Sequence, residues 1–554
     1  MTKPAIFFHP DAVETKGKDI VGRRSSGQSF LKGFLAHAGG ETVYGVTQTK
    51  AGRKPFEDAA RSLGETRPIQ TRHLRGKEGF TEPDAIFFPG PGYLDAAWRR
   101  QRFGQDSCSL VGITHTVSTR RVIEGMHTLM GEPVEDWDAI ICTSRAVQSV
   151  VQEQMQLEAD YYRSRFGATR VPQPQLPLIP LGIHTADFAR TDAARDHMRS
   201  KLNVPDDAVV VMTMGRFTSV EKANPVPLYL VLESIVRSTG KPVHLWQVGW
   251  AGRDKEEEMH RAGAAALCPS VTVTFVDGRV PENRRHVWSG ADIFTLPVDN
   301  IQETFGLVPV EAMAAGLPVV MPDWDGFRDT VVDGATGFLV PTMMTAPGGG
   351  PNIAQRYADG TDDYLRYLSI VQQQTMIDIP SYKAALTALI DNPDLRRKMG
   401  DAGRVHVQAS FDWAQIIPRY LELTEELTAR RKVGEQTTPP MGGGAISPIE
   451  VDPFRLYRSY PTLHPTPEMI VGPSAPLTAE ILADLDKVNG RDLYQRRILP
   501  DDMMLQIADA LHRDGPRSIS QIATDLNLNI GHVTAGLLFL SKFDFARIEL
   551  ESTK

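Results

Sequence analysis

Short, continuous apolar runs alternate with amphipathic stretches from the start of the chain to about residue 430. Strands that are apolar along their whole length are typical of parallel sheets covered by helices on both faces, whereas a half-solvated sheet shows alternating residues. The pattern therefore predicts an α/β chain with doubly wound, Rossmann-like sheets. Nine runs are expected to form strands: Ala5–Phe8, Ala85–Phe88, Leu110–Ile113, Ala139–Cys142, Val209–Met214, Val243–Val248, Val271–Phe275, Asp292–Leu296 and Pro318–Met321.

The domain organisation follows from the length of the chain and from a pause in this series. At 554 residues the chain is too long for one core. The apolar runs stop at a proline-dense stretch, residues 172–180, and restart at Val209. We therefore expect two Rossmann-like domains that face each other across a cleft.

Five segments result from this division. We predict a first Rossmann-like domain over residues 1–190 and a second over residues 191–410. Residues 411–432 are expected to form a helix that crosses back to the first domain. A Pro/Gly-rich linker is predicted over residues 433–475, and a small, mostly helical module over residues 476–554.

The C-terminal module has the order of a winged helix-turn-helix. Residues 518–526 and 530–543 are expected to form two helices separated by a short break, and residues 545–550 alternate like a strand. One face of the preceding helix is apolar: Met504, Ile507, Ala508 and Leu511.

The charge of this module argues against DNA binding. Residues 476–554 carry 12 acidic and 9 basic residues, and the second helix of the pair offers no Arg or Lys before Lys542. A DNA-reading helix needs cations and base-edge donors at that place. We therefore expect no nucleic-acid partner, and we assign the module to contact with another protein or to self-association.

Composition narrows the remaining function classes. The net charge of −8 and the pI of about 6.0 provide no overall basic field for nucleic acid or acidic lipid. Three cysteines, Cys108, Cys142 and Cys268, lack zinc-like spacing and predict buried thiols in a reducing cytosol. No apolar run has the length of a membrane span. We expect a cytoplasmic protein with no metal and no cofactor, and with membrane contact, if any, peripheral at the inner face.

The most informative stretch surrounds two glutamates. A buried strand is expected to end near Pro297, and a loop then carries Glu303. A helix is expected to start near Gly306 and to stop at Gly316, with Glu311 inside it. The helix start would lie at the carboxyl end of a parallel sheet, where open α/β folds bind ligands and where free amides favour phosphate.

The same stretch carries a family resemblance. Residues 303–320 read E-T-F-G-L-V-P-V-E-A-M-A-A-G-L-P-V-V. This sequence closely resembles the motif of glycosyltransferase family 4, the large retaining GT-B family, in which two glutamates eight positions apart lie within F-G-x-x-x-x-E-A-M-A-x-G-x-P-V-V. Similar short motifs extend the resemblance over roughly the first 430 residues. The resemblance implies a two-domain GT-B fold and a glycosyltransferase activity. On this interpretation residues 1–190 form the acceptor-side domain and residues 191–410 the nucleotide-sugar donor domain.

The resemblance also implies roles for the residues of this stretch. Glu303 would bind hydroxyl groups of the donor sugar, and Glu311 would bind the ribose of the nucleotide. The donor would also contact Phe305, Gly306 and Leu307 at the start of the helix. On this interpretation the two glutamates hold the donor and are not an acid–base couple.

A cationic pair is expected to hold the donor diphosphate. Gly215 and Arg216 end the run that starts at Val209, and Lys222 follows. They resemble the family's strand-end Gly-Arg with a following Lys, although the gap is one residue longer here. When no metal is bound, the charge of a diphosphate leaving group must be met by Arg, Lys and backbone amides.

Two elements of the first half resemble the family's groups on the other side of the cleft. Residues 22–27 begin with Gly22 and end with Gly27, and we expect a glycine-bearing loop that approaches the donor or acceptor ahead of a helix over residues 28–36. An ordinary turn is the alternative. His115 follows a buried strand and resembles the family's histidine near the reacting face of the donor sugar. A purely structural histidine is the alternative there.

One loop departs from the family pattern. Residues 323–331 occupy the place of the common G-G-x-x-E loop. Only Gly326 remains of the glycine pair, and Asp329 stands where the glutamate usually is. The departure indicates an effect on the choice of sugar or nucleotide.

The implied reaction moves a sugar from a nucleoside-diphosphate sugar to a hydroxyl of an unidentified glycan, lipid or small molecule, with UDP as the first candidate nucleotide from its frequency in the family. His115, Arg216, Lys222 and Glu303 would carry catalysis without a metal. The departing phosphate would help to deprotonate the acceptor on the same face of the sugar. Two alternatives stay open: a nucleotide-sugar epimerase of the same architecture, and a non-catalytic scaffold or regulator that acts through the C-terminal module.

Overall fold

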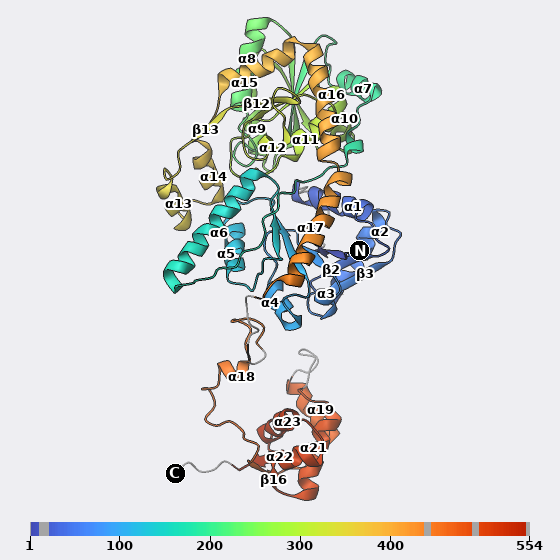
Figure 1. Ribbon diagram of the computed structural model, residues 1–554, viewed down its shortest axis with the longest axis vertical. Coiled ribbons are helices and arrows are strands. Elements are labelled where there is room, and N and C mark those ends of the chain that lie inside the picture. Colours follow the sequence, from blue (N-terminus) through green and yellow to red (C-terminus); the bar gives the residue numbers. More distant parts are fainter. Residues whose placement is uncertain (1, 10–21, 437–441, 443–444, 490–497, 550–554) are drawn as a thin grey trace. The chain divides into compact units, whose positions relative to one another are not determined.

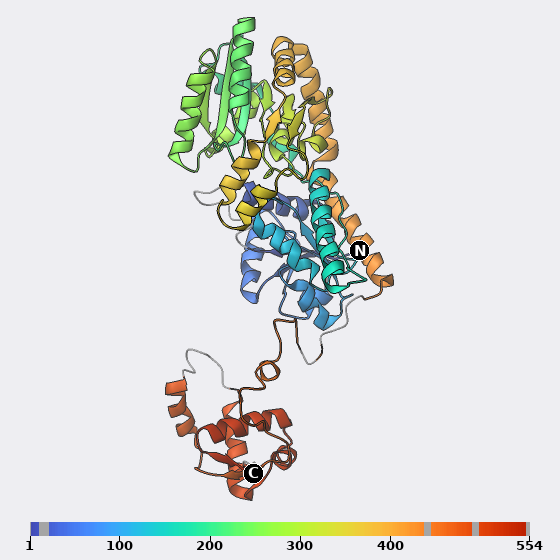
Figure 2. The same cartoon turned by 90° about the vertical axis from the view of Figure 1, so that its left-hand side faces the viewer.

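The computed structural model describes residues 2–9, 22–436, 442, 445–489 and 498–549. The chain divides into two compact units, Met1–Pro448 and Ile449–Lys554. The first unit contains two α/β domains, each built around one parallel sheet (Figures 1 and 2). The fold predicted for the first 430 residues is therefore confirmed.

The first domain holds a six-stranded parallel sheet with the order β3-β2-β1-β4-β5-β6. The order reverses between β1 and β4, and we call such a place a switch point. The strands are β1 (Pro4–Phe8), β2 (Val43–Thr47), β3 (Ile69–His73), β4 (Ala85–Phe87), β5 (Ser109–Ile113) and β6 (Ala139–Ile141). The helices of this domain are α1 (Gly22–His37), α2 (Arg53–Ser62), α3 (Glu78–Thr81), α4 (Ala96–Arg100), α5 (Arg120–Met130) and α6 (Arg145–Phe166).

The second domain repeats this topology. Its sheet has the order β12-β11-β10-β7-β8-β9, with the switch point between β7 and β10. The strands are β7 (Val209–Arg216), β8 (Val243–Trp250), β9 (Thr272–Asp277), β10 (Ile293–Thr295), β11 (Val319–Pro322) and β12 (Gly337–Val340). The helices are α7 (Asp192–Lys201), α8 (Val226–Thr239), α9 (Asp254–Leu267), α10 (Pro281–Gly290), α11 (Leu307–Ala314), α12 (Phe327–Thr330), α15 (Ile379–Asp391) and α16 (Pro393–Ser410).

All nine apolar runs that were expected to be strands form strands of these two sheets. The pattern does not predict β2, β3 or β12. It also does not predict the strands and helices of a small insertion between β12 and α15, in which two antiparallel strands enclose two helices. The insertion consists of β13 (Thr342–Met344), α13 (Pro351–Ala358), α14 (Tyr364–Gln372) and β14 (Thr375–Ile377).

The expectation of a glycine-bearing loop over residues 22–27 is wrong, because these residues form the first turns of α1. Local propensity opposes this helix, since each internal glycine costs about 1 kcal/mol relative to alanine. Tertiary packing outweighs that cost. A Cβ atom on Gly33 would lie 2.5 Å from Cγ of Trp413, so the glycine lets α1 pack directly against the indole.

The helix predicted over residues 411–432 is α17 (Trp413–Val433). It follows α16 of the second domain and lies along the first domain, against α1, β4 and β5 (Figure 1). Trp413 and Tyr420 are buried, and their rings pack against Phe30 of α1 at centroid distances of 5.6 and 5.4 Å. The helix therefore ties the second domain to the core of the first.

The second unit is described by itself. It contains α18 (Pro453–Leu456), β15 (Ile470–Pro473), α19 (Ala479–Asn489), α21 (Asp501–Asp514), β16 (Arg517–Ser518), α22 (Ile519–Asp525), α23 (Ile530–Lys542) and β17 (Ala546–Ile548). The expected helix-turn-helix is α22 and α23. However, the central strand of its sheet is β15. This strand precedes the helices and lies within residues 433–475, for which only a linker was predicted.

Two further expectations concern burial. Cys108, Cys142 and Cys268 are all buried and unbridged, as predicted. Within the ranges that the structure describes, none of the helices combines the length and apolar character that a bilayer crossing needs.

Candidate functional site

The residues predicted to bind the donor converge at the switch point of the second sheet. Arg216 is the last residue of β7, and the loop after β10 carries Glu303. Ligands of open α/β sheets bind beyond the carboxyl ends of the strands at this place, because the loops on either side diverge and leave a crevice. The topology thus explains why two motifs that are about 90 residues apart meet.

Lys222 and Glu303 form an ion pair at the centre of the site. Lys222 Nζ lies 2.8 Å from Glu303 Oε2, and their side chains are 21% and 17% exposed. Burial raises the pKa of Glu303, but the charge of Lys222 and its hydrogen bond outweigh burial and hold the pKa below its ordinary value. Glu303 is therefore an anion at neutral pH. Asn300 fixes the lysine backbone, since its side chain donates to the Lys222 carbonyl at 2.9 Å.

Arg216 lies beside this pair with a weaker partner. Its Nη1 is 3.6 Å from Glu221 Oε2, and its side chain is 36% exposed. Gly215 makes room for the neighbouring lysine, because a Cβ atom there would lie 3.0 Å from Lys222 Cε. Two cations are thus gathered at one strand end. The extra residue between Arg216 and Lys222 does not keep the lysine out of the site.

The helix predicted between Gly306 and Gly316 is α11. Gly306 is its N-cap with φ of +83°, a left-handed conformation that glycine adopts without steric cost. Because glycine has no side chain that could accept a hydrogen bond, the amides at the start of the helix are not capped by a side chain. Glu311 is half-buried on this helix, and burial raises its pKa to about 7 despite the nearby charge of Lys222. Phe305 differs from the prediction in one respect. Its ring is 2% exposed and packs on Phe411, so Phe305 can reach a donor only through its backbone.

The first domain supplies His115 to the same place. His115 is half-buried just after β5, and its carbonyl oxygen accepts a hydrogen bond from the hydroxyl of Thr304. Because Thr304 follows Glu303 directly, this bond sets His115 beside the loop that carries Glu303. Gly22 and Gly27, which were predicted to bind the donor from a loop, belong to α1.

The divergent loop at residues 323–331 contacts both domains. Asp329 accepts hydrogen bonds from the backbone amide of Arg145 at 2.7 Å and from its Nε at 2.5 Å. The residue in the place of the family's glutamate therefore binds the N-terminus of α6 in the first domain. This ion pair bridges the two domains.

Asp325 in this loop was not predicted as a site residue. It has φ of +46°, which is rare for a residue other than glycine and marks a strained backbone. The hydroxyl of Ser144 in the first domain lies 3.4 Å from Asp325 Oδ1. The other carboxyl oxygen, Asp325 Oδ2, is buried and has no hydrogen-bond partner within the described ranges. Burial and the charge of Glu303 raise its pKa to about 8. Asp325 is thus a neutral acid at pH 7, with one hydrogen-bonding atom unused.

The insertion closes one side of the site. The hydroxyl of Tyr364 on α14 lies 2.8 Å from that of Ser118 in the first domain and donates to Gln302 at 3.2 Å. Gln372 on the same helix donates to Asp299 at 2.6 Å, and burial raises the pKa of Asp299 to about 6. The loop that carries Glu303 is therefore held from both domains.

A group with the geometry of a metal site lies elsewhere. His197, Glu282 and His286, on α7 and α10, have ligand atoms within 4.8 Å of one another in the part of the chain that the structure describes. None of them belongs to the site around Glu303. What the site offers chemically is a pair of cations and an uncapped helix start for a diphosphate, with three carboxyl groups for hydroxyls.

Comparison with known proteins agrees with this geometry. Residues 208–346 match the family described as "Glycosyl transferases group 1". A D-inositol 3-phosphate glycosyltransferase from Nocardia farcinica is 28% identical over 322 residues, which cover 56% of this chain and 60% of that protein. A lipopolysaccharide 1,2-N-acetylglucosaminetransferase from Salmonella typhimurium is 28% identical over 187 residues, 33% of this chain and 47% of that protein. The chain thus spans about half to three fifths of the length of these relatives.

Among solved structures, a sucrose-phosphate synthase from Thermosynechococcus elongatus gives a TM-score of 0.47 at 19% identity, over 77% of this chain and 100% of that one. A glycosyltransferase from Rickettsia africae gives 0.48 at 13% identity, over 77% and 98%. The segment that matches the family model contains both strand ends at the switch point of the second sheet, with Arg216, Lys222, Glu303 and Glu311. Residues 208–346 are thus similar to the group 1 glycosyl transferases.

Proposed function

We propose that this protein is a glycosyltransferase that moves a sugar from a nucleoside-diphosphate sugar to an acceptor hydroxyl with retention of configuration. One observation carries the proposal: Arg216, Lys222, Glu303 and the start of α11 converge at the switch point of a domain similar to the group 1 glycosyl transferases. Two relatives, the D-inositol 3-phosphate glycosyltransferase and the lipopolysaccharide 1,2-N-acetylglucosaminetransferase, are named as sugar transferases, which supports the same class of reaction.

The proposed diphosphate site uses the two cations and the helix start. Each cation already faces a carboxylate, Arg216 at 3.6 Å and Lys222 at 2.8 Å. A diphosphate that enters between them brings more negative charge than one carboxylate, so it competes well for both cations. The amides of Gly306 and Leu307 lie at a helix N-terminus, which favours anions. These groups would supply the charge that a metal supplies in other transferases.

The carboxyl groups of Glu303, Glu311 and Asp325 would each bind hydroxyl groups of the donor. Glu303 is ionised and accepts hydrogen bonds from sugar hydroxyls, while Glu311, further along α11, accepts from the ribose. Asp325 is neutral at pH 7 and can donate a bond, so it adds a donor to the two accepting groups. The additional hydrogen-bond donor, Asp325, would change which donor sugar the site prefers.

In the proposed reaction, the bond between the anomeric carbon and the diphosphate breaks, and the acceptor oxygen bonds to the same face. The proton of the acceptor hydroxyl passes to a diphosphate oxygen. Arg216 and Lys222 stabilise the charge that develops on the leaving group. His115, held by Thr304, lies on the first-domain side and supports the sugar.

The test is product analysis with the full chain. UDP-, GDP- and ADP-glucose are incubated with and without a mixed set of alcohol and glycoside acceptors, and products are identified by mass spectrometry. The proposal expects a glycosylated acceptor and one equivalent of nucleoside diphosphate, both lost in Arg216→Ala. Arg397→Ala is the matched control, because Arg397 is 72% exposed on α16 and its ion pair is local, with Asp394. Free sugar and nucleotide in equal yield without acceptor would instead indicate an epimerase or hydrolase.

A further inference from the structure

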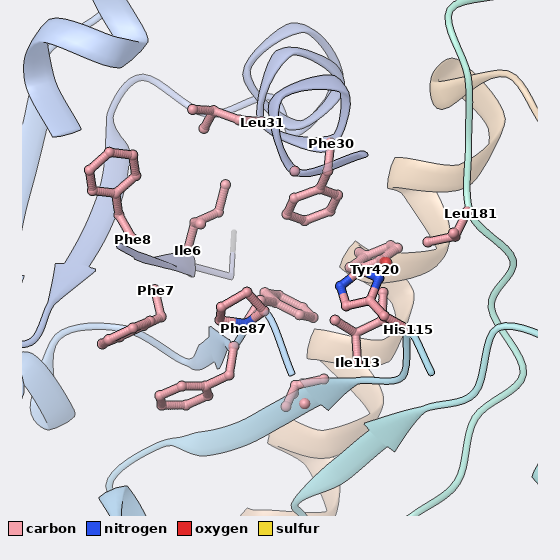
Figure 3. Close-up of a pocket in the computed structure, with 15 residues that line it drawn as sticks. Ile6, Phe7, Phe8, Phe30, Leu31, Phe87, Ile113, His115, Leu181 and Tyr420 are labelled. Carbon is pink, nitrogen blue, oxygen red and sulfur yellow. The ribbon is translucent and has the colours of Figure 1, made fainter. Parts of the chain in front are cut away.

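An apolar pocket lies at the switch point of the first sheet, where β1, β4 and β5 end. Figure 3 shows that the lining includes Phe30 of helix α1, Tyr420 of helix α17, and strand residues such as Ile6, Phe87 and Ile113. The full lining is Ile6, Phe7, Phe8, Gly27, Phe30, Leu31, Phe87, Phe88, Pro89, Val111, Gly112, Ile113, His115, Leu181 and Tyr420. These described lining residues include no Asp, Glu, Lys or Arg, so the pocket favours an apolar group over a charged one.

One end of this pocket adjoins the donor site. His115 lines the pocket, and its carbonyl oxygen holds the hydroxyl of Thr304 beside Glu303. A molecule that fills the pocket and projects past His115 would therefore place its outer end at the donor sugar. This contact joins the two switch points of the protein.

The pocket wall also carries an unsatisfied hydroxyl. Tyr420 is 1% exposed, and its ring packs on Phe30 and Phe87 at centroid distances of 5.4 and 5.2 Å. Its hydroxyl has no hydrogen-bond partner among the residues that the structure describes. A buried hydroxyl without a partner destabilises a protein. A ligand with a polar atom next to its apolar part would supply the missing bond.

We propose that this pocket binds the acceptor by an apolar group, a short alkyl chain or an aromatic ring, and presents the acceptor's hydroxyl at the His115 end. The inference rests on the proposed transferase function, and it adds the class of acceptor: an amphipathic alcohol. Residues of α1, α17 and the sheet line the pocket, so the size of the pocket limits the length of the apolar group. One relative is named for an inositol phosphate, which is a polar compound, so this acceptor class would differ from that one.

The experiment measures binding of n-alkyl β-D-glucopyranosides to the full chain by isothermal titration calorimetry. Methyl, butyl, hexyl and octyl glucosides are titrated below their micellar concentrations, without donor. The pocket predicts an association constant that rises about fourfold per methylene and then stops rising once the pocket is full. No turnover is needed, so the result stands apart from the test of transferase activity.

A pocket-filling variant and a matched control complete the test. Gly27→Leu fills the pocket from α1 and does not weaken that helix, since leucine has a high helix propensity. Gly125→Leu makes the same change on α5, where a Cβ atom meets nothing within 4 Å. We expect Gly27→Leu to abolish the dependence on chain length and Gly125→Leu to keep it. Should Gly27→Leu unfold, Ile113→Trp fills the same pocket from β5.

Three results would overturn the inference. One is equal affinity for all four glucosides in the wild type. Another is a chain-length dependence that survives in Gly27→Leu or Ile113→Trp. The third is an affinity that keeps rising to the longest chain in every variant, which would mean non-specific partition onto an apolar surface. A normal binding series in a protein that transfers no sugar would contradict the proposed function and leave the pocket assignment intact.

Discussion

In the second domain, the strand ends at the switch point carry Arg216, Lys222 and the loop of Glu303, whereas in the first domain they carry Phe87, Ile113 and other apolar residues. Both sheets have the same strand order, read from the switch point outward. The difference shows that strand order determines where a ligand can lie, and that a few residues at the strand ends determine what the ligand is. One fold thus provides a charged site and an apolar site that face each other.

The largest effect is expected when a charged residue of the second-domain site is removed. Arg216→Ala and Glu303→Ala should each lower kcat/KM by about 10²–10³-fold, because one charge-stabilising or sugar-holding group is lost from a pre-organised site. Circular dichroism and thermal melting should show folded proteins. Steady-state kinetics with Arg397→Ala as control measures the effect, and near-normal transfer by Arg216→Ala would remove that residue from the site.

A second prediction concerns pH and sharpens the role of Asp325. Burial and the charge of Glu303 raise its pKa in the folded state to about 8, far above the ordinary value of an aspartate in an unfolded chain. The folded state therefore binds a proton that the unfolded state releases, so the contribution of Asp325 to stability is greatest at low pH and falls as pH rises towards 8. Glu311, with a pKa raised to about 7, acts in the same direction.

Asp325→Asn removes this dependence at one site. At pH 4 the variant and the wild type should melt at similar temperatures, and the variant should be the more stable by a growing margin between pH 5 and pH 8. Melting curves by differential scanning calorimetry test this. A margin that does not change with pH would contradict the buried, neutral state of Asp325.

A smaller effect is expected on the apolar side. Tyr420→Phe keeps the ring that packs on Phe30 and Phe87 and removes only the hydroxyl. The melting temperature should stay the same or rise, because an unsatisfied buried group is removed, whereas octyl glucoside should bind about fivefold more weakly. Isothermal titration calorimetry at one temperature measures the binding of octyl glucoside to the wild type and to Tyr420→Phe. A lower melting temperature would mean that the hydroxyl already has a partner in the free protein.

The smallest effect concerns the bridge between the domains. Arg145 is 71% exposed, although its partner Asp329 is only 15% exposed. Solvent screens such a pair, and exposed pairs contribute about 0–1 kcal/mol. Arg145→Ala should therefore change kcat/KM by no more than about fivefold, with a smaller difference at high salt. An effect as large as that of Arg216→Ala would mean that this contact sets the closed arrangement of the site.

The sequence predicts strands whose apolar run is continuous, whether they lie at the centre or at an edge of a sheet. Nine strands follow from such runs, and β6 and β9 are among them although they lie at sheet edges. The edge strand β3 was missed because polar residues, which are tolerated where one side lacks a neighbour, interrupt its run. The short edge strand β12, Gly337–Val340, was missed as well. In β2 the interruption is Gly45, where a Cβ atom would lie 2.1 Å from the ring of Phe56. Close packing of a helix against the sheet required the glycine and broke the pattern.

The motifs of the candidate site were predictable, including Arg216, Lys222 and His115, but most contacts between them were not. Glu303, Gly306 and Glu311 come from a single strand–loop–helix stretch, and α11 has the predicted bounds within two residues. The pairing of Lys222 with Glu303, and of Asp325 with Ser144, joins residues 81 and 181 positions apart. The apolar pocket draws on three strands and two helices. Such sites depend on how elements pack, which periodicity does not report.

One set of titrations tests the central claim most directly. Wild type, Arg216→Ala and Gly27→Leu are each titrated with the nucleoside diphosphate that binds the wild type most tightly among UDP, GDP and ADP, and with octyl glucoside. Two independent switch-point sites predict that Arg216→Ala weakens nucleotide binding by about tenfold or more, the cost of losing one charge-assisted bond, and leaves the glucoside unchanged, while Gly27→Leu does the reverse. If either variant weakens both ligands equally, or if Arg216→Ala leaves nucleotide binding unchanged, the division into a charged and an apolar site is wrong.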